Sequence, residues 1–310
     1  MALVTQTTNP PGPESRPLMA AKPAPAGGGT RAWLGLAQRT GRTWRKYGKI
    51  GRMAFMERLA YRGDLMLIWL LELTSAATGI LLWAAIYQGA GQARLSGFDR
   101  REMIAYLLLV HIGRVFSPAP GLALSFAREI RDGTLKKYLL QPLDLFAYWL
   151  SYWAGYRLAY VAISCLPYGL VLVLCRNYFD GWPGLLNVAA YVAALLLGFL
   201  VGFFFAAAIG MAGFWFLEVT SFVSVINAVN VFVSGQMVPL DLLPPFWANL
   251  LKLLPFPYLG YFPAVVFLGK VPGNELAYGL LTELTWALIF FGLSRRLYHR
   301  GLRRYSAYGD

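Results

Sequence analysis

Long runs of apolar residues, separated by short segments that are polar or contain proline and glycine, make up most of the chain. Roughly 20 helical residues cross the hydrocarbon core of a bilayer, which is about 30 Å thick, and several runs reach that length. The pattern therefore predicts an all-α integral membrane protein with six transmembrane helices. The predicted spans are Leu65–Gln88, Glu102–Phe116, Leu145–Cys175, Leu186–Phe214, Val219–Val238 and Leu276–Leu293.

The segments outside these spans differ from one another in character. The N-terminal residues are rich in Pro, Ala and Gly and have no apolar signal-peptide region, which predicts a disordered cytoplasmic tail. The next segment mixes arginines with Trp33, Trp44 and Leu59, as in an amphipathic interfacial helix. Its arginines could also serve simply as a positive-inside anchor, and the two interpretations are compatible. The predicted organisation is a tail at 1–30, an interfacial helix at 31–64, a transmembrane domain at 65–298 and a basic cytoplasmic tail at 299–310.

The stretch PLDLLPPFWANLLKLLPFPYLGYFPAVVFLGKVPG lies between the last two predicted spans. It is too apolar for a water-exposed loop, and its prolines would interrupt a single long helix. Short re-entrant helices satisfy both constraints if the rest of the protein covers their free backbone groups.

The composition agrees with a membrane protein, because 57% of the residues are hydrophobic and 14% are charged, against about 25% charged in soluble domains. The net charge of +13 could indicate nucleic-acid binding, but the cations gather at the ends of the apolar runs. Six spans put 18 Lys and Arg on one side and six on the other. The positive-inside rule then places both termini in the cytoplasm, and no nucleic-acid partner is expected.

The cytoplasmic segment SFAREIRDGTLKKYLLQPLD between the second and third spans holds seven charged residues. Gly133 suits the left-handed end of a short helix, and Thr134 could cap the turn after it. Two interpretations are open. The segment could be an interfacial elbow, or its mixed charge could dock into a polar groove of a protein partner.

The fourth and fifth spans each contain a periodic set of small or polar residues. In the fourth, Gly198, Gly202, Ala206 and Gly210 predict close helix packing, either within the chain or at a dimer seam. In the fifth, a polar stripe occupies about 120° of the helix surface. It either supplies interhelical hydrogen bonds or lines a translocation route, and it consists of Thr220, Ser224, Asn227, Asn230 and Ser234.

Ionisable residues within the spans are costly in lipid and often functional. Glu72, Glu283 and His111 are candidates of this kind, although Glu72 could also reach the interface. Arg157 is expected to extend to the cytoplasmic side. The tyrosines and tryptophans around it favour interfacial anchoring over an aromatic surface for cationic drugs. The sequence has no catalytic constellation and no cluster with metal-ligand spacing.

The segment EIRDGTLKKYLLQPLD resembles the E-I-R-x-G-T-L-x-x-x-L-L-x-P-L signature of ABC-2-type transporter permeases, in the branch of six-span bacterial permeases. The resemblance extends to AYRGDLMLIWLL, to GQMVPLDLLPPFWANLLKLLPFPY and to HRGLRRYSAYG, and so covers about residues 40–310. It implies a half-transporter in the bacterial inner membrane, in which two permease chains, identical or different, pair above two ATP-binding subunits. The coupling helix that docks those subunits would include Arg128, Glu129, Arg131, Asp132, Gly133, Thr134, Leu135 and Lys136.

No GxxxxGK[ST] phosphate-binding motif occurs in the chain. ATP and Mg²⁺ are therefore expected in the partner subunit, with no cofactor in this chain and no ATPase activity of its own. An ion-coupled secondary transporter is the alternative, and it would depend on Glu72, Glu283 and His111. Nothing in the sequence selects among drugs, lipids, glycans and ions as the exported cargo.

Overall fold

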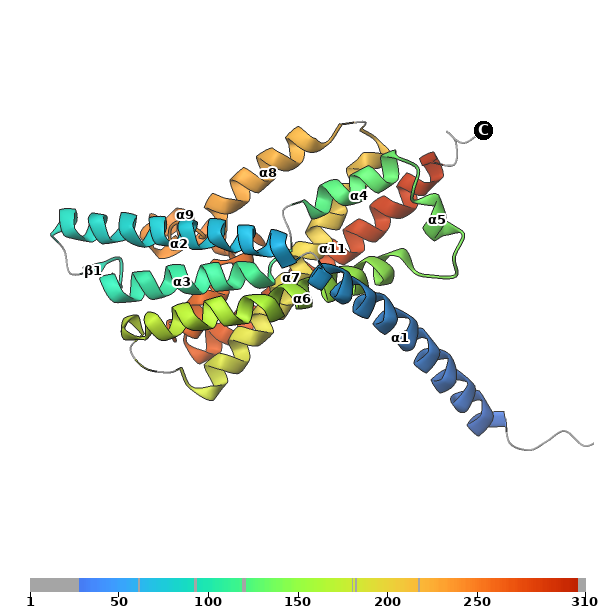
Figure 1. Ribbon diagram of the computed structural model, residues 1–310, viewed down its shortest axis with the longest axis horizontal. Helices are drawn as coiled ribbons and strands as arrows, with labels where there is room; N and C mark the ends of the chain where they lie inside the picture. The colour runs from blue at the N-terminus through green and yellow to red at the C-terminus, as the bar shows by residue number, and fades with distance from the viewer. Residues whose placement is uncertain are drawn as a thin grey trace, which may run out of the picture. The chain divides into compact units, whose positions relative to one another are not determined.

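The computed structural model describes residues 28–60, 62–91, 94–118, 121–179, 181, 183–216 and 218–305, and side chains from Trp44 onward apart from residues 62 and 64–66. The chain divides into two compact units, Met1–Arg45 and Lys46–Asp310. Most of the predicted N-terminal tail lies outside the described residues. The second unit contains every helix and strand after the first helix of the chain (Figure 1).

Four helices among the described residues are long and apolar enough to cross a membrane. They lie within α2 (Arg62–Ala90), α6 (Leu145–Leu174), α7 (Leu185–Gly210) with its extension η2 (Met211–Phe214), and α11 (Gly273–Tyr305). The predicted second and fifth spans correspond to α3 (Arg100–Phe116) and α8 (Thr220–Val233). At 1.5 Å per residue these two helices are about 25 Å and 21 Å long, shorter than the hydrocarbon core. Six spans thus remain a prediction.

The part of α1 (Gly28–Ala60) that belongs to this unit crosses the first half of α6 very closely. A Cβ atom added to Gly155 would overlap the backbone of Gly51. Two polar contacts lie beside this crossing: the backbone N–H of Asp144 donates to the Tyr47 hydroxyl at 3.1 Å, and the Tyr152 hydroxyl donates to Glu57 at 3.1 Å. This end of α1 is therefore held against α6 by close backbone packing.

A short β-hairpin departs from the all-α expectation. Strands β1 (Arg94–Leu95) and β2 (Phe98–Asp99) pair in antiparallel fashion. Ser96 and Gly97 between them have φ values of 44° and 86°, as a two-residue hairpin turn requires. Asp99 then accepts a hydrogen bond from the Glu102 backbone and Glu102 accepts one from Asp99, so that a capping box starts α3.

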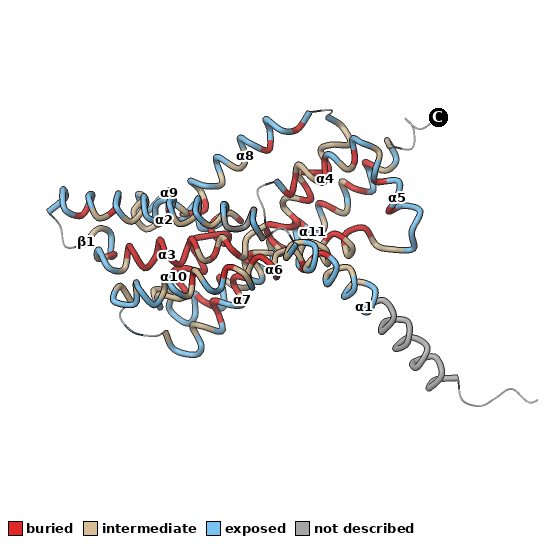
Figure 2. The backbone as a smooth tube through the Cα atoms, in the orientation of Figure 1, coloured by how far each residue is buried: buried red, intermediate tan, exposed pale blue. Residues whose placement is uncertain are grey.

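Helix α7 is the centre of the packing, and contacts α3, α10 and α11 as well as α4 (Leu122–Arg131). Three of the small residues singled out in the sequence lie where other elements of the same chain approach. An added Cβ would come within 3.0 Å of the Tyr258 carbonyl oxygen at Gly198, 2.7 Å of Pro118 at Gly202 and 2.7 Å of Phe126 at Gly210. Figure 2 shows the buried residues gathered along these elements.

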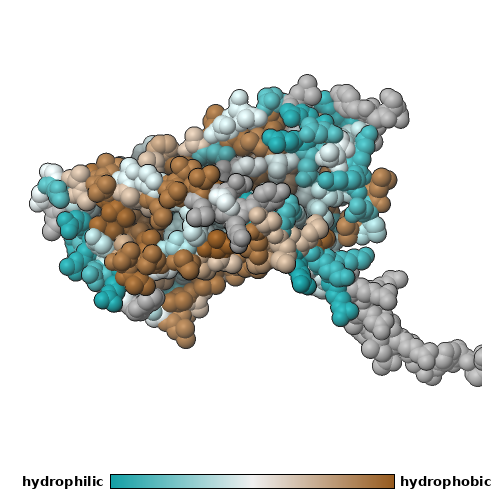
Figure 3. All heavy atoms as spheres, viewed as in Figure 1, coloured by the Kyte–Doolittle hydropathy of each residue, from teal (hydrophilic) through white to brown (hydrophobic). Residues whose placement is uncertain are grey.

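Three hydrophobic clusters form the core of the described residues: two large ones, one toward each end of the unit, and a small one of Val115, Tyr160 and Tyr168. The hairpin cluster includes Phe98, Tyr106 and Val265. The elbow cluster includes Phe126, Trp149, Phe203 and Tyr298. On the face seen in Figure 3, apolar side chains lie between two hydrophilic ends, the distribution expected of a protein that crosses a bilayer.

The proline-rich stretch before α11 forms short helices, as the sequence predicts. They are η3 (Leu240–Leu242), α9 (Pro245–Lys252), η4 (Phe256–Leu259) and α10 (Tyr261–Phe267). Protein covers α10 and its polar groups: the Tyr261 N–H donates to the Ser234 carbonyl at 3.0 Å, and the Tyr261 hydroxyl donates to Asp241 at 2.7 Å. The re-entrant position in the membrane remains a prediction.

Candidate functional site

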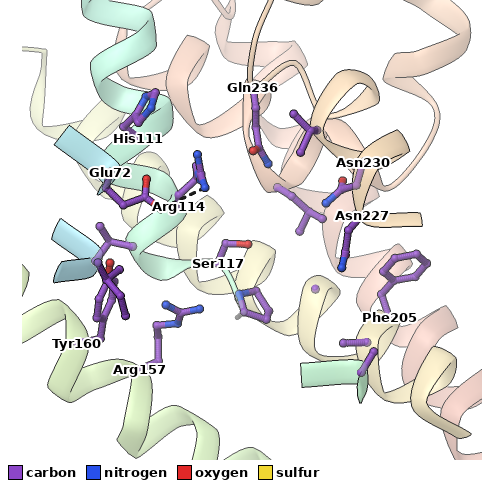
Figure 4. A pocket seen from close by; sticks show the side chains of 18 of the residues that line it. Glu72, His111, Arg114, Ser117, Arg157, Tyr160, Phe205, Asn227, Asn230 and Gln236 are labelled. Carbon is purple, nitrogen blue, oxygen red and sulfur yellow. Dashed lines mark hydrogen bonds and ion pairs between the residues drawn. The ribbon is translucent and has the colours of Figure 1, made fainter. Parts of the chain in front are cut away.

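A cavity of about 290 Å³ opens between α2, α3 and α6 on one side and α7 and α8 on the other. Figure 4 shows charged and aromatic side chains on the first wall, with Asn227, Asn230 and Gln236 facing them. Apolar residues such as Ile68, Phe205 and Val223 complete the lining. A polar cavity bounded by membrane-spanning helices is where a transport protein can accommodate cargo.

The ion pair between Glu72 of α2 and Arg114 of α3 lies in this cavity. The Arg114 Nη2 atom donates to Glu72 Oε1 at 3.1 Å, and the two side chains are 36% and 21% exposed. The second Glu72 oxygen, Oε2, is buried and has no hydrogen-bond partner. The sequence had left Glu72 between a functional role and snorkelling, and the structure places it in the cavity.

His111 lies one turn before Arg114 on the same wall and is only 7% exposed. Its Nδ1 atom is 2.9 Å from the Leu107 carbonyl oxygen, which can only accept, so Nδ1 carries a proton. The Nε2 atom is buried without a hydrogen-bond partner. One ring nitrogen is therefore left for a ligand or a water molecule.

Two further arginines line the same wall, and each lies over a tyrosine ring. The Arg58 guanidinium is 4.7 Å from the ring centre of Tyr156, and that of Arg157 is 5.3 Å from Tyr160. The expectation that Arg157 simply reaches toward the cytoplasm misses this placement, because its side chain lines the cavity. The crossing of α1 over α6 brings Arg58 to the same place.

The five residues of the polar stripe in the fifth predicted span lie in different surroundings and do not form one continuous surface. Asn227 and Asn230 line the cavity, and the Asn230 Oδ1 atom is buried without a hydrogen-bond partner. Ser224 is exposed outside the cavity, and Ser234 is fully buried after the end of α8. Thr220 starts the helix, where its N–H donates to Glu218 at 2.7 Å. The helix is shorter than the predicted span, which is why the stripe ends early.

The segment expected to dock an ATP-binding subunit forms α4, a turn and the short helix α5 (Lys136–Leu139). Gly133 has φ +72°, the left-handed conformation predicted for it. Thr134 does not cap the following turn; its hydroxyl donates to the Glu129 carbonyl oxygen at 3.1 Å and thereby caps α4. Exposed side chains of this segment, which we call the elbow face, are Arg128, Arg131, Asp132, Thr134, Lys136, Lys137, Leu139 and Leu140.

Two members of the predicted docking set turn inward. Leu135 has no exposed surface and packs in the elbow cluster. Glu129 accepts a hydrogen bond from the Trp149 indole at 3.2 Å. Burial raises the pKa of the Glu129 carboxyl, while the Trp149 hydrogen bond and the nearby Lys137 charge lower it. Leu135 therefore does not belong to the surface that a partner could contact, and Glu129 is only partly exposed on it.

Glu283 on α11 is separate from the cavity. It has no exposed surface, and both carboxylate oxygens lack a hydrogen-bond partner. It lies against α7, where a Cβ at Gly198 would be 3.3 Å from its Oε1 atom. The three ionisable candidates of the sequence thus divide, with Glu72 and His111 in the cavity and Glu283 outside it.

The profile of the ABC-2 family of transporter proteins matches residues 73–309, most of the chain. The chain belongs to this family. No curated protein matches the sequence. As an ABC-2 family member with several apolar helices, the chain is a multi-pass membrane transport protein whose family works with ATP-binding subunits in ABC transporters. The family resemblance drawn from the sequence is confirmed.

The family match leaves individual residues unassigned, and sequence reasoning missed part of the cavity of this ABC-2 protein. Arg58 and Gln236 were not singled out, and Arg157 was given a different role. A cation in the middle of an apolar run, with tyrosines one and three residues away, is a signal that could have identified Arg157. Arg58 had no such signal, because it comes from a segment already rich in arginine.

Proposed function

We propose that the chain is the permease subunit of an ATP-driven exporter in a bacterial inner membrane, with both termini in the cytoplasm. The match to the ABC-2 family over residues 73–309 is the observation that supports it. In this proposal two permease chains pair, and two ATP-binding subunits hold ATP and Mg²⁺. The charge asymmetry of the sequence supports the orientation.

The cavity is the proposed route for cargo. Its charged wall and the amides of Asn227 and Asn230 give cargo hydrogen-bonding partners at a depth where lipid offers none. Helix α2 supports the proposal of a second copy: of its most apolar stretch only 11% is buried within the chain. An exposed face of this kind can contact lipid or a second permease chain.

Replacing Asn227 or Asn230 by leucine tests the route. If each amide holds cargo with one hydrogen bond worth about 1 kcal/mol, transport should slow roughly fivefold per assembled complex. Ser224→Leu is the matched control, because Ser224 is on the same helix outside the cavity. Transport is measured in inside-out vesicles with ATP. Equal effects of all three variants, or loss of assembly alone, would mean that the stripe serves packing.

The elbow face is the proposed dock for the ATP-binding subunit. It combines charges of both signs with two exposed apolar side chains, since Leu140 is 87% exposed and Leu139 is 44% exposed. Exposed apolar side chains rimmed by charged ones are typical of a surface that a protein partner covers. The mixed charge then sets the orientation of docking.

Leu140→Asp and Arg128→Glu test the dock. Each should weaken co-purification with the ATP-binding subunit by about tenfold, the effect of losing an interface contact worth about 1.4 kcal/mol. Arg94→Glu, an exposed arginine in the β-hairpin, is the control. If the elbow variants bind the subunit as well as Arg94→Glu does, the segment is only a connection between helices.

A further inference from the structure

The charges of the cavity do not balance. Its wall contains three guanidinium groups, from Arg58, Arg114 and Arg157, and one carboxylate, from Glu72. Glu72 forms its ion pair with Arg114. Arg58 and Arg157 stack on tyrosines without a carboxylate within ion-pair distance among the described residues. Arg157 is near enough to be repelled by Arg58 and attracted by Glu72, whose single charge is already paired with Arg114. Two cations thus share a polar site whose surroundings are apolar, an arrangement that a bound anion would stabilise.

Four of the side chains that line the cavity each have a hydrogen-bonding atom without a partner among the described residues. These atoms are Arg58 Nε, Glu72 Oε2, His111 Nε2 and Asn230 Oδ1, and all four are buried. Buried polar groups are normally paired, so these atoms call for a partner such as water or a ligand. Only Arg58 Nε is a donor suited to an oxyanion, whereas the other three atoms accept and fit a water molecule or an N–H or O–H group of a ligand. The 7% exposure of His111 shows that at least one of them is well shielded from bulk water.

The aromatic residues argue against a cationic ligand. Tyrosine rings could attract a cationic drug, but the faces of Tyr156 and Tyr160 are already covered by Arg58 and Arg157. A cation entering the cavity would meet repulsion from both arginines. The tyrosines instead hold the guanidinium groups in place, which leaves their N–H edges free to contact an oxyanion.

Apolar side chains make up much of the lining on both sides of the cavity, beside the charged groups and around the facing amides. Ile68, Val115, Phe205, Val223 and Val231 border the charged wall. A fully hydrated ion would leave these surfaces wet, whereas an amphiphile would place its apolar part against them.

We propose that the cavity binds the oxyanion head of an amphiphile, a phosphate ester or a carboxylate, through Arg58 and Arg157. The inference rests on the proposed function for its role in transport, but the binding site itself does not require ATP or a partner subunit. Arg114 and Glu72 hold the wall in place, and the side-chain amide N–H of Asn230 donates to the ligand from the facing helix.

Ligand binding to the purified full-length permease in neutral maltoside detergent tests the proposal. Decyl phosphate is titrated while the unfolding temperature is recorded, and decyltrimethylammonium and decyl phosphocholine serve as probes of opposite and zero net charge. Decyl phosphate should stabilise the protein at about tenfold lower concentration than either, because it alone can form charge-assisted hydrogen bonds without repulsion. Equal stabilisation by the cationic probe would overturn the proposal.

Arg157→Gln should weaken decyl phosphate binding about tenfold, the effect of losing one charged hydrogen-bonding group. Arg176→Gln, a control on the exposed turn after α6, should leave it unchanged. If Arg157→Gln fails to fold, Arg157→Lys keeps the charge without the planar fork and should weaken binding by a smaller factor. Unchanged binding in both Arg157 variants and in Arg58→Gln would overturn the assignment.

The source of the oxyanion is tested with two further ligands. Stabilisation in nanodiscs of phosphatidylglycerol but not phosphatidylcholine, lost in Arg157→Gln, supports a bilayer lipid head. Stabilisation by inorganic phosphate alone, equally dependent on Arg157, supports a free anion and overturns the amphiphile. Anion binding by a permease that recruits no ATP-binding subunit would refute the proposed function and leave the site intact. Recruitment of the ATP-binding subunit and transport without anion binding would refute the anion site and leave the proposed function intact.

Discussion

Helices α7 and α2 are both predicted from the sequence as apolar spans but have different places in the structure. Half of the most apolar stretch of α7 is buried within the chain, against 11% for α2. Helix α7 contacts its neighbours through closely approaching backbone, whereas Gly79 of α2 has no atom near its missing Cβ. A hydrophobic run therefore identifies a span, and only the contacts of its small residues distinguish a central helix from a peripheral one.

Helix α2 is held by a few directed polar contacts instead. Its Glu72 pairs with Arg114, the Trp69 indole donates to Ser164 at 3.0 Å, and the Trp83 indole donates to the Met237 carbonyl at 3.3 Å. One polar contact of this kind can be removed without disturbing the others, whereas a change in closely packed backbone displaces all of its neighbours together. The cavity lies between the two kinds of helix, with Gly202 from α7 and Glu72 from α2 in its lining.

Gly210→Val is expected to have the largest effect. The new side chain would collide with Phe126 and the Ala123 carbonyl, whose atoms lie within 3 Å of the added Cβ, and overpacking of this kind costs about 3 kcal/mol. Gly79→Val on α2 has open space around it and should change the free energy of unfolding by less than about 0.5 kcal/mol. Unfolding in mixed detergent micelles measures both. Similar losses would remove the distinction between the two helices.

Gly133→Ala tests the elbow that packs against the end of α7. With φ at +72°, alanine should cost about 1.5 kcal/mol in the free energy of unfolding. Gly121→Ala, before α4, has φ −80° and open space, so it should be nearly neutral. The pair is compared in the same unfolding assay, and a neutral Gly133→Ala would contradict the conformation described.

Glu72→Gln should detach α2 in part. Removing the carboxylate leaves Arg114 without its ion-pair partner; because both groups are partly exposed, we expect a loss of about 1 kcal/mol. Lys252→Gln removes a more exposed pair with Asp241 and should cost less. Hydrogen exchange should rise in α2 for Glu72→Gln while α7 stays protected. Equal exchange in both helices would mean that α2 and α7 open together.

The smallest expected effect is a pH dependence at Glu129. Its pKa is raised by burial, so folding favours the protonated form, and the stability it contributes at low pH is lost as the pH rises through the raised pKa. Glu129→Gln should keep the Trp149 hydrogen bond and flatten this decline. Unfolding curves of the two proteins from pH 4 upward, which we expect to differ by less than about 1 kcal/mol, make the comparison. Parallel curves would show that Glu129 titrates in the folded protein as it does unfolded.

The sequence determined the helices more completely than the cavity. Helix α6 begins at Leu145 as predicted, where Asp144 caps it, and α3 ends at the residue predicted from the prolines after it. These boundaries depend on local chemistry. The position of Arg58 over Tyr156 depends on how two distant segments cross, and the inward turn of Leu135 depends on what covers it. Neither can be read from periodicity along one helix, and the same holds for the stripe on α8.

Helix α11 connects the elbow to the buried carboxylate of Glu283 through one continuous helix. It runs unbroken from Gly273 to Tyr305, and near its C-terminal end Gly301 packs directly on Phe214, while Tyr305 approaches Gly133 of the elbow. The 18 residues from Glu283 to Gly301 make an arm of about 27 Å. A tilt of about 5° at the elbow would displace the far end of that arm by about 2 Å. A small movement of the elbow would then displace the buried carboxylate of Glu283 by a distance comparable to the shift of one helix past its neighbour.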